Sequence, residues 1–532
     1  MSSFRKYPVG IQSFESIRKD GYVYVDKTPL IYKMITEGKP YFLSRPRRFG
    51  KSLLCSTLEA LFQGRRELFE AFTTEDGIEQ PQLFIATTNW KWEKYPVIRF
   101  DFSKNKIYTT EILELQIDNT LSLYEQEYDI KAKSTDSSTR FQHIITEAHR
   151  QTGQRVVVLV DEYDNFMLHS IGDSQLEDGV RTIFSNLFGS LKSLDDHLQF
   201  VFITGISKFS QMGIFSTLNN LKNISMLAKY EAICGITEEE LTTQLKPDIE
   251  QLAQNRGKTL DETFEELKKM YDGYHFSRRM TDIYNPFSLI NAFDSGEIED
   301  YWFESATPSA VIEMLSKMPP IQLTDIDGVT CSEEDFDVPF DSYKYPIPVL
   351  FQSGYITIKE FDSEYHEYVL GLPNSEVRRG LANCLYKYTM PARGIDTNKN
   401  ALFRAYNRFG RSGDLTAFIE AVKTFFSGIP YQLANKGEHH YHVVLYTLLT
   451  AFGADITAEE STAKGRADLV LKMPGRIYVI ELKYDDSADA ALAQIRQRGY
   501  ADKYRSDGRP ITKVGISFSS AERNITEWKS EE

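Results

Sequence analysis

Two carboxylates and one amine near the end of the chain have the types and spacing needed for metal-dependent chemistry. Within GRADLVLKMPGRIYVIELKY (465–484), Asp468 precedes Glu481 by thirteen positions, and Lys483 follows Glu481 by two. Alternate residues of a strand point to the same face, so Glu481 and Lys483 share a face. If residues 473–476 form a four-residue turn, Asp468 lies directly opposite Glu481. Two carboxylates beside an ammonium are the groups that divalent-metal cleavage of a phosphodiester requires.

A plainer interpretation of the same segment is a hairpin whose charges lie at its solvated end, with Lys483 paired to Asp468. Short motifs of this kind also arise by chance. Residues 477–480, however, are apolar on both faces, which is typical of a strand that is covered on both sides. Charges at the end of such a strand are unfavourable unless they are paired or bind a metal. The pattern therefore favours the metal site.

The elements that must position these groups are predicted on either side of the hairpin. Residues 441–452 (YHVVLYTLLTAF) predict an apolar helix ending at Gly453, and residues 488–504 predict a second helix. Helix, strand, hairpin strand and helix in this order resemble the core of the PD-(D/E)XK nucleases, over roughly residues 430–510. Asp468 and the triplet 481–483 fit the central motif of that family residue by residue.

The metal expected at this site is Mg²⁺, with Mn²⁺ as an alternative, because the available ligands are hard oxygens. The expected ligands are the side chains of Asp468 and Glu481, the carbonyl of Leu482, and one further carboxylate, for which the sequence leaves Glu438 and Glu460 open. The metal lowers the pKa of a bound water, and Lys483 orients that water or stabilises charge on the phosphate. Histidines 439, 440 and 442 are not expected to bind zinc, because adjacent histidines at a helix start rarely point to one centre.

A second set of residues, near the start of the chain, could bind a phosphate. YFLSRPRRFGKS (41–52) predicts a short strand, a loop and then a helix over residues 53–62, with backbone N–H groups and the helix N-terminus facing an anion. Lys51 would contact the β- and γ-phosphates, and Ser52 would ligate Mg²⁺. Arg45 stands where the usual pattern has its first glycine. The expected nucleotide-binding residues of the loop are Arg47, Arg48, Phe49, Gly50, Lys51, Ser52 and Leu53.

Two further strands carry polar groups that suit the same nucleotide. RVVVLVDEYD (155–164) is a continuous β-branched run that predicts a strand buried in a parallel sheet. Asp161 would hold the Mg²⁺ through water, and Glu162 would activate the attacking water. A strand over residues 198–203 ends at Thr204, whose side chain would contact the γ-phosphate. The alternative is a doubly wound domain with acidic strand ends and no nucleotide.

With these motifs together, the chain resembles the bacterial AAA-ATPase-like family. The resemblance rests on SRPRRFGKS, LVDEYD, TGISKFSQMGIFSTLNNL and YEAICGITEEEL, and it extends through YDGYHF (271–276), YNPFSLI (284–290), YWFESATP (301–308) and LFQSGYITI (350–358). Members of that family commonly carry a C-terminal PD-(D/E)XK domain. An arginine-bearing phosphate loop is usual among them, which accounts for Arg45.

The expected fold class is α/β, with a P-loop NTPase core on a parallel sheet, a helical lid region and a C-terminal restriction-endonuclease-like domain. The core ends near Thr237, where Glu240 completes a capping box. The expected domains are the AAA-like core at 1–240, the helical lid region at 241–372, a helical connector at 373–425 and the nuclease domain at 426–532.

Bulk composition excludes some classes of protein. The chain of 532 residues has a net charge of −15, so it lacks the overall positive charge of proteins that bind nucleic acid over much of their surface. A basic cluster from Arg496 to Arg509 nevertheless lies beside the proposed nuclease site. That cluster is equally well interpreted as a solvated helix face. No apolar run is long enough to span a membrane. Four scattered cysteines without a CxxC pair predict a reducing, cytoplasmic location.

We therefore expect a protein that binds and hydrolyses ATP and thereby controls a metal-dependent nuclease. The expected catalytic residues are Asp468, Glu481 and Lys483 in the nuclease and Glu162 in the ATPase. The expected partners are ATP and nucleic acid, with DNA favoured over RNA and a homo-oligomer left open. On family grounds alone, defence against foreign DNA is a plausible setting. The rival hypothesis is a nucleotide-dependent switch or scaffold whose nuclease fold binds nucleic acid without cutting it.

Overall fold

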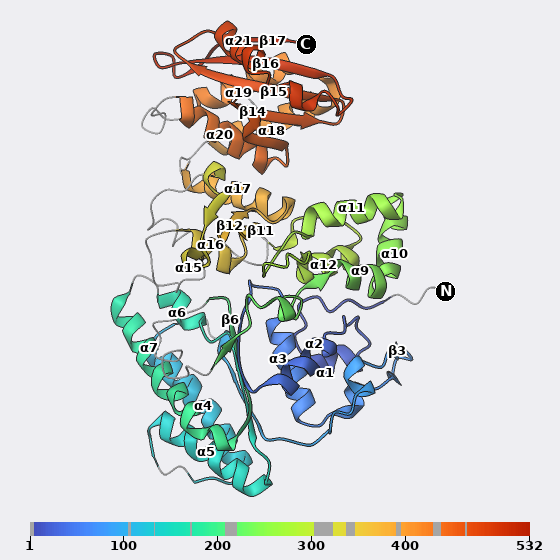
Figure 1. The fold of residues 1–532 in the computed structure, drawn as a ribbon, viewed down its shortest axis with the longest axis vertical. Coiled ribbons are helices and arrows are strands. Elements are labelled where there is room, and N and C mark those ends of the chain that lie inside the picture. The colour runs from blue at the N-terminus through green and yellow to red at the C-terminus, as the bar shows by residue number, and fades with distance from the viewer. Residues whose placement is uncertain are drawn as a thin grey trace. The chain divides into compact units, whose positions relative to one another are not determined.

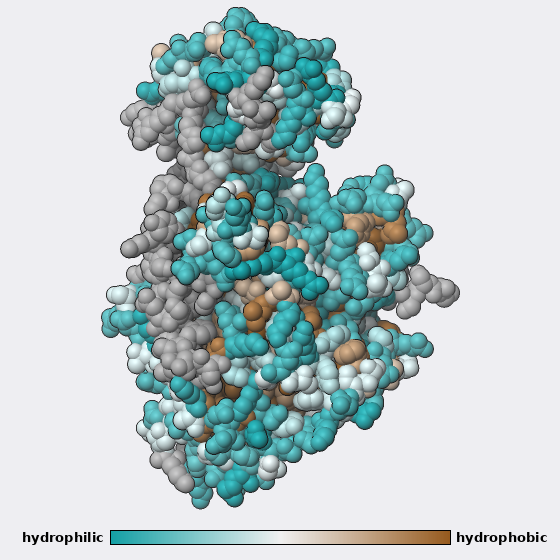
Figure 2. Space-filling model, viewed as in Figure 1, coloured by the Kyte–Doolittle hydropathy of each residue, from teal (hydrophilic) through white to brown (hydrophobic). Residues whose placement is uncertain are grey.

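The computed structural model separates the chain into two compact units, Met1–Pro319 with Gly328–Glu376 and Pro320–Asp327 with Val377–Glu532. The structure describes residues 5–104, 108–131, 134–170, 173–207, 221–302, 323–336, 346–389, 395–428, 438–462 and 465–532. Figure 2 shows hydrophilic side chains over most of the visible surface, with small apolar patches between them. Among the helices within these ranges, none is long and apolar enough to cross a membrane.

The N-terminal unit is built on a five-stranded parallel sheet, as predicted. Its order is β4-β5-β6-β1-β7, with β1 at Pro40–Ser44, β4 at Val97–Asp101, β5 at Val156–Asp161, β6 at Leu198–Gly205 and β7 at Lys222–Asn223. Every residue of β5 is buried, which explains its β-branched run. The carboxyl ends of all five strands meet at one edge, where the predicted nucleotide-binding residues gather.

Helices cover both faces of this sheet (Figure 1). On one side lie α1, α2 and α3 (Phe14–Lys19, Thr28–Glu37 and Lys51–Phe62), and on the other α4, α5 and α7 (Thr110–Glu127, Ser137–Thr152 and Ser174–Gly189). The short α6 (Asn165–Ser170) follows β5, and a small hairpin pairs β2 (Phe72–Thr73) with β3 (Glu79–Gln80). Phenylalanines from β4, α5 and α7 pack edge-to-face beneath the second layer of helices.

A helical region follows the core and begins at the predicted capping box. The Thr237 side chain accepts from the Glu240 N–H, and the Glu240 carboxylate accepts from the Thr237 N–H at 2.8 Å. Strand β8 (Ile236–Thr237), before α9, pairs antiparallel with β9 (Ile283–Tyr284), before α12. Its helices are α9 (Glu238–Gln244), α10 (Lys246–Arg256), α11 (Leu260–Tyr271) and α12 (Pro286–Ser295). Their apolar faces form one buried cluster around Leu241, Leu267 and Leu289.

The later part of the predicted lid also contains strands, which the aromatic-rich pattern did not indicate. A three-stranded antiparallel sheet has the order β10-β12-β11, with β10 at Val329–Cys331, β11 at Thr357–Asp362 and β12 at Glu367–Gly371. Helices α15 (Glu333–Phe336) and α16 (Pro346–Ser353) accompany it. Strands of three to six residues are too short to show a clear alternation in the sequence.

The C-terminal unit is a mixed five-stranded sheet with helices around it. Its order is β13-β14-β15-β16-β17, at Asp455–Thr462, Gly465–Met473, Arg476–Tyr484, Ile511–Ser519 and Asn524–Glu531. The helices before it are α17 (Ser375–Thr389), α18 (Ile395–Ser412), α19 (Leu415–Ser427) and α20 (Glu438–Ala451). Strand β15 pairs with β14 antiparallel and with β16 parallel. The crossover between β15 and β16 contains α21 (Ala488–Arg498).

The second predicted helix of this unit is shorter than expected. Residues 488–504 predicted one helix, but α21 ends at Arg498 because Gly499 adopts φ 62°, a left-handed conformation that closes the helix. A separate 3₁₀ turn covers Asp502–Tyr504. Tyr504 is buried in the same apolar cluster as Tyr500, so the apolar pattern correctly indicated buried residues even though the helix is interrupted.

Candidate functional site

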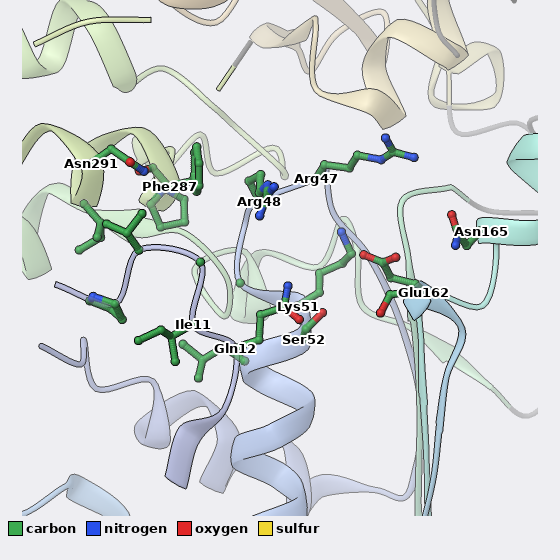
Figure 3. A pocket seen from close by; sticks show the side chains of 18 of the residues that line it. Ile11, Gln12, Arg47, Arg48, Lys51, Ser52, Glu162, Asn165, Phe287 and Asn291 are labelled. Atoms are coloured by element: carbon green, nitrogen blue, oxygen red, sulfur yellow. The ribbon is translucent and has the colours of Figure 1, made fainter. Parts of the chain in front are cut away.

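The phosphate loop opens onto a cavity of about 520 Å³ (Figure 3). Gly50 caps α3 with φ 93°, and the first residues of that helix line the cavity. Arg47, Arg48 and the segment 8–12 form one side, and Glu162 and Asn165 form another. A helix N-terminus beside two arginines and a lysine suits an anionic ligand. Of the predicted loop residues, Arg47, Arg48, Gly50, Lys51, Ser52 and Leu53 all line this cavity.

Lys51 is held inside the loop that it follows. Its side chain is buried, and Nζ donates to the carbonyl oxygens of Arg45 at 2.9 Å and Pro46 at 3.0 Å. Burial lowers the pKa of Lys51, while the carboxylates of Glu162 and Asp164 oppose that change. In Figure 3 the Lys51 and Glu162 side chains point toward each other across the cavity. A phosphate placed between them would meet the ammonium on one side.

Arg45, at the position of the missing glycine, turns away from the cavity. Its guanidinium donates to the carbonyl oxygens of Ser225 at 2.7 Å and Glu231 at 3.2 Å and lies 4.1 Å from the ring centroid of Phe276. The side chain is 2% exposed. The loop therefore tolerates an arginine at this position, because the side chain packs in the interior and its guanidinium has hydrogen-bond acceptors and an aromatic ring there.

Strand β5 ends in Asp161, an acidic residue next to the phosphate loop. Asp161 is 1% exposed, and the Ser52 side chain lies close enough to oppose the rise in its pKa. Arg99 on β4 lies 3.4 Å from Asp161 Oδ2 and donates to Glu59 at 2.8 Å. Burial raises the pKa of Asp161, and its Oδ1 is buried without a hydrogen-bond partner among the described residues. An orphaned carboxylate oxygen beside a serine hydroxyl fits Mg²⁺.

Glu162 follows Asp161 in a left-handed conformation, with φ 51°, and lines the cavity. A non-glycine residue in this region is strained, and such strain is common where a side chain must be aimed. Burial raises the pKa of Glu162, and Lys51 opposes the shift. A carboxylate with a raised pKa is a stronger base, which suits the predicted activation of water.

Three of the predicted nucleotide-binding residues, Asp161, Thr204 and Phe49, do not line this cavity. Thr204 is fully buried and donates its hydroxyl to the carbonyl of Leu43 at 2.8 Å. Phe49 is 1% exposed and packs edge-to-face on Tyr274 and Phe276. Neither side chain is among those lining the 520 Å³ cavity. Thr204 and Phe49 therefore make structural contacts in the interior next to the phosphate loop.

Three features of the nucleotide site were missed by the sequence interpretation. The segment 8–12 and the α12 residues Pro286, Phe287, Ile290 and Asn291 line the cavity from parts of the chain with no nucleotide motif. The guanidinium of Arg48 lies 4.8 Å from the ring centroid of Phe287, so the loop contacts α12 directly. The third feature is Arg99, which the sequence indicated only by placing a charged residue within the otherwise apolar strand VIRFD.

The nuclease-like site forms at the end of the predicted hairpin. Strand register pairs Met473 with Arg476 and Leu469 with Ile480, and one further step places Asp468 opposite Glu481. Asp468 Oδ2 accepts from the backbone N–H of Leu482 at 2.8 Å. This confirms the predicted hairpin.

Glu481 has the environment of a metal ligand. It is 1% exposed, and its Oε1 accepts from Lys483 Nζ at 3.2 Å. The Lys483 ammonium also opposes the rise in the pKa of Asp468. Burial and then the neighbouring Asp468 raise the pKa of Glu481 to about 7, and burial also raises the pKa of Asp468. Glu481 Oε2 is buried without a hydrogen-bond partner among the described residues. Two facing carboxylates with an orphaned oxygen fit a divalent cation.

His442 is a neighbour that sequence reasoning did not place. It is 5% exposed on α20, and its Nε2 lies 2.8 Å from the backbone carbonyl of Asp468, to which it donates. The imidazole also opposes the rise in the pKa of Asp468. His442 therefore fixes the strand end that carries Asp468. In the sequence, His442 could have been identified from its position on the buried face of the predicted helix, rather than from the run of histidines.

The further carboxylate predicted as a ligand stays a prediction. Glu438 opens α20 and Glu460 lies in β13, but their side chains fall outside the described residues. Register pairs Ala458 with Leu469 and Glu460 with Ala467, which places Glu459 between them, opposite Asp468. Glu459 is exposed and ion-paired to Arg466 at 2.6 Å.

The basic cluster beside this site is largely neutralised where its contacts are described. Arg496 pairs with Glu531 at 2.5 Å, Arg505 with Asp502 at 2.6 Å and Arg509 with Asp507 at 2.5 Å. Exposed ion pairs of this kind leave little net positive charge. Of the two interpretations left open, the described contacts favour the solvated face.

Comparison with known proteins identifies two domains in the chain. Residues 8–215 match the family model described as predicted AAA-ATPase, and residues 436–528 match that of the PD-(D/E)XK nuclease superfamily. The chain is 33% identical over 539 aligned positions to a protein of Azotobacter chroococcum mcd 1, described as an uncharacterized protein in the vnfD 5' region, and the match covers 98% of each chain. The chain belongs to the family of predicted AAA-ATPase-like proteins that carry a C-terminal PD-(D/E)XK nuclease superfamily domain.

Proposed function

We propose that this protein binds and hydrolyses ATP and uses it to control a divalent-metal nuclease that cleaves DNA. The observation that carries the nuclease proposal is Glu481, whose buried Oε2 has no hydrogen-bond partner among the described residues while Asp468 faces it from the adjacent strand. A pure binding module has no need for two such carboxylates and a paired lysine, because their burial destabilises the fold unless a cation offsets it.

In the ATPase, residues of the chain supply most of the required groups. Lys51 and the N–H groups at the start of α3 would bind the β- and γ-phosphates, with Arg47 and Arg48 at the mouth of the cavity. Ser52 and Asp161 would hold Mg²⁺, which would offset negative charge on the phosphates. Glu162 would accept a proton from the attacking water. Residues 8–12 and α12 would enclose the rest of the nucleotide.

In the nuclease, Asp468, Glu481 and the carbonyl of Leu482 would hold Mg²⁺ or Mn²⁺, with Glu438 or Glu460 as a further ligand. The cation supplies a bound water of lowered pKa and offsets charge on the leaving oxygen. Lys483, whose ammonium lies 3.2 Å from Glu481 Oε1, would hold the water or stabilise charge on the phosphate. His442 would keep Asp468 in place through its backbone carbonyl.

The test incubates the purified full-length protein with plasmid, single-stranded DNA and RNA in Mg²⁺ or Mn²⁺, with and without ATP. We expect DNA cleavage that depends on the metal, responds to ATP and is lost in Glu481→Gln. The matched control Glu522→Gln removes an exposed carboxylate of the same unit and should leave cleavage unchanged. Lys51→Ala should abolish ATP turnover, whereas Lys192→Ala, an exposed lysine of the same unit, should not.

Each half of the proposal fails separately. Cleavage that persists in Glu481→Gln would point to a contaminant and would remove the nuclease assignment. ATP turnover that is unchanged in Lys51→Ala would remove the phosphate-loop assignment. Nucleic-acid binding without any cleavage, in a protein that still hydrolyses ATP, would support the switch or scaffold instead.

A further inference from the structure

Three carboxylates that belong to neither site described above lie close together near the start of α9, the end of α11 and the start of β9. Register pairs Ile236 with Tyr284 and Thr237 with Ile283, so the next residue of each strand, Glu238 and Asp282, also faces its counterpart. One carboxylate oxygen from each of Glu238, Asp272 and Asp282 lies within 4.8 Å of the other two. Such spacing matches the oxygen–oxygen distances around a single divalent cation.

Asp272 is the member that an ordinary ion-pair network does not explain. It is the C-cap residue of α11 and is 4% exposed. Its Oδ1 is buried without a hydrogen-bond partner among the described residues. The hydroxyl of Tyr284 is likewise buried without a hydrogen-bond partner among the described residues. An unsatisfied buried carboxylate is unfavourable unless something absent from the protein chain satisfies it.

Two basic side chains already lie at the other two carboxylates. Lys268 Nζ is 2.6 Å from Glu238 and 3.6 Å from Asp282, and His275 Nε2 is 2.8 Å from Asp282. Lys268 is 38% exposed at the last turn of α11, so its long side chain can swing into solvent. His275 is anchored differently, because its Nδ1 also lies 2.7 Å from the carbonyl of Ile358. The ammonium is therefore the group that a ligand would displace.

We propose that Glu238, Asp272 and Asp282 bind a divalent cation that prefers oxygen ligands, of the Ca²⁺, Mg²⁺ and Mn²⁺ class, in exchange for the Lys268 ammonium. The His275 imidazole hydrogen-bonds the Asp282 carboxylate and would orient it, as residues next to a metal ligand commonly do. Asp272 and His275 both belong to YDGYHF (271–276), a motif that the nucleotide and nuclease sites leave without a chemical role.

The cation ties three elements of the N-terminal unit together. Glu238 opens α9, Asp272 ends α11 and Asp282 precedes β9. The same motif supplies Tyr274 and Phe276, whose rings pack on Phe49 of the phosphate loop. Bound cation would therefore fix the lid against the loop that receives the nucleotide.

The experiment titrates Mn²⁺ by calorimetry into full-length protein stripped of metal and free of nucleotide, in an Asp468→Asn/Glu481→Gln background that removes the nuclease site. We expect Asp272→Asn to lose one equivalent of bound Mn²⁺. Lys268→Met should bind that equivalent about two- to fivefold more tightly, since it removes a competing ion pair of ordinary surface strength. Glu239→Gln, at an exposed neighbour on α9, should bind as the background does.

The two variants separate a cation site from a structural ion-pair network. If the carboxylates only pair with Lys268, then Lys268→Met binds no tighter and lowers the thermal midpoint with or without Mn²⁺, which overturns the proposal. An unchanged number of Mn²⁺ equivalents in folded Asp272→Asn overturns it as well. If Asp272→Asn does not fold, the affinity of Lys268→Met decides alone, because tighter binding supports the site and unchanged or weaker binding refutes it.

Discussion

Replacing Glu376 with glutamine should remove most of the pH dependence of the stability of the N-terminal unit between pH 6 and pH 8.5. Glu376 is fully buried and accepts from the backbone N–H of Trp302 at 2.7 Å and from the hydroxyl of Ser288 at 2.8 and 3.0 Å. Burial raises its pKa to about 8 from an ordinary value of 4.5, against the opposing effect of those two donors.

The sign and size of the effect follow from proton linkage. Because the folded pKa is the higher one, the unfolded chain ionises first as pH rises, and stability is lost between pH 4.5 and pH 8. The loss is about 1.4 kcal/mol per pH unit in that window, which gives about 2 kcal/mol at pH 6 and about 4.5 kcal/mol at pH 8.5. Glutamine is neutral throughout, and it can accept from Trp302 and donate to Ser288. The wild type should therefore lose about 2.5 kcal/mol more than the variant over this range.

Urea unfolding at pH 6 and pH 8.5, followed by tryptophan fluorescence, measures the difference. Three of the four tryptophans, Trp90, Trp92 and Trp302, belong to the N-terminal unit and report on it. Glu239→Gln, which removes an exposed carboxylate of the same unit, should keep the wild-type dependence on pH. If Glu376→Gln and the wild type lose stability in parallel, Glu376 does not stay protonated in the folded protein and the electrostatic reasoning is refuted.

Three further substitutions test the two sites. Arg99→Met should destabilise the N-terminal unit by about 3 kcal/mol in urea unfolding, because it leaves Asp161 buried without its guanidinium; a change under about 1 kcal/mol would contradict this. Gly354→Ala should lower stability by about 2 kcal/mol and weaken ATP binding in calorimetry, since Gly354 has φ 84° and a new Cβ would lie 2.6 Å from the Cβ of Pro46; unchanged ATP affinity would show that the loop absorbs the contact. Lys483→Met should slow DNA cleavage about 100-fold while Mn²⁺ binding is retained, and loss of the metal instead would make Lys483 a structural partner of the ligands.

Much of the fold followed from local patterns, since those patterns depend on neighbouring residues. The β-branched run of β5 and the strand–loop–helix of residues 41–62 formed where expected, because burial on both faces and a glycine before a helix impose their geometry within a few residues. The three-stranded sheet was missed, because its strands are short and β10 pairs with β12 across some forty residues. The helix over 488–504 was overextended because its interruption depends on Gly499 adopting a left-handed conformation.

The sequence by itself determined that Asp468 faces Glu481, since a two-residue period and the turn at 473–476 leave one register. Only the tertiary structure decided what surrounds such groups. Arg45 is acceptable in the phosphate loop because Phe276, distant in the chain, receives its guanidinium, and Asp272 meets Glu238 because β8 pairs with β9. Burial and charge pairing between distant segments depend on how whole elements pack, and no local pattern encodes that packing.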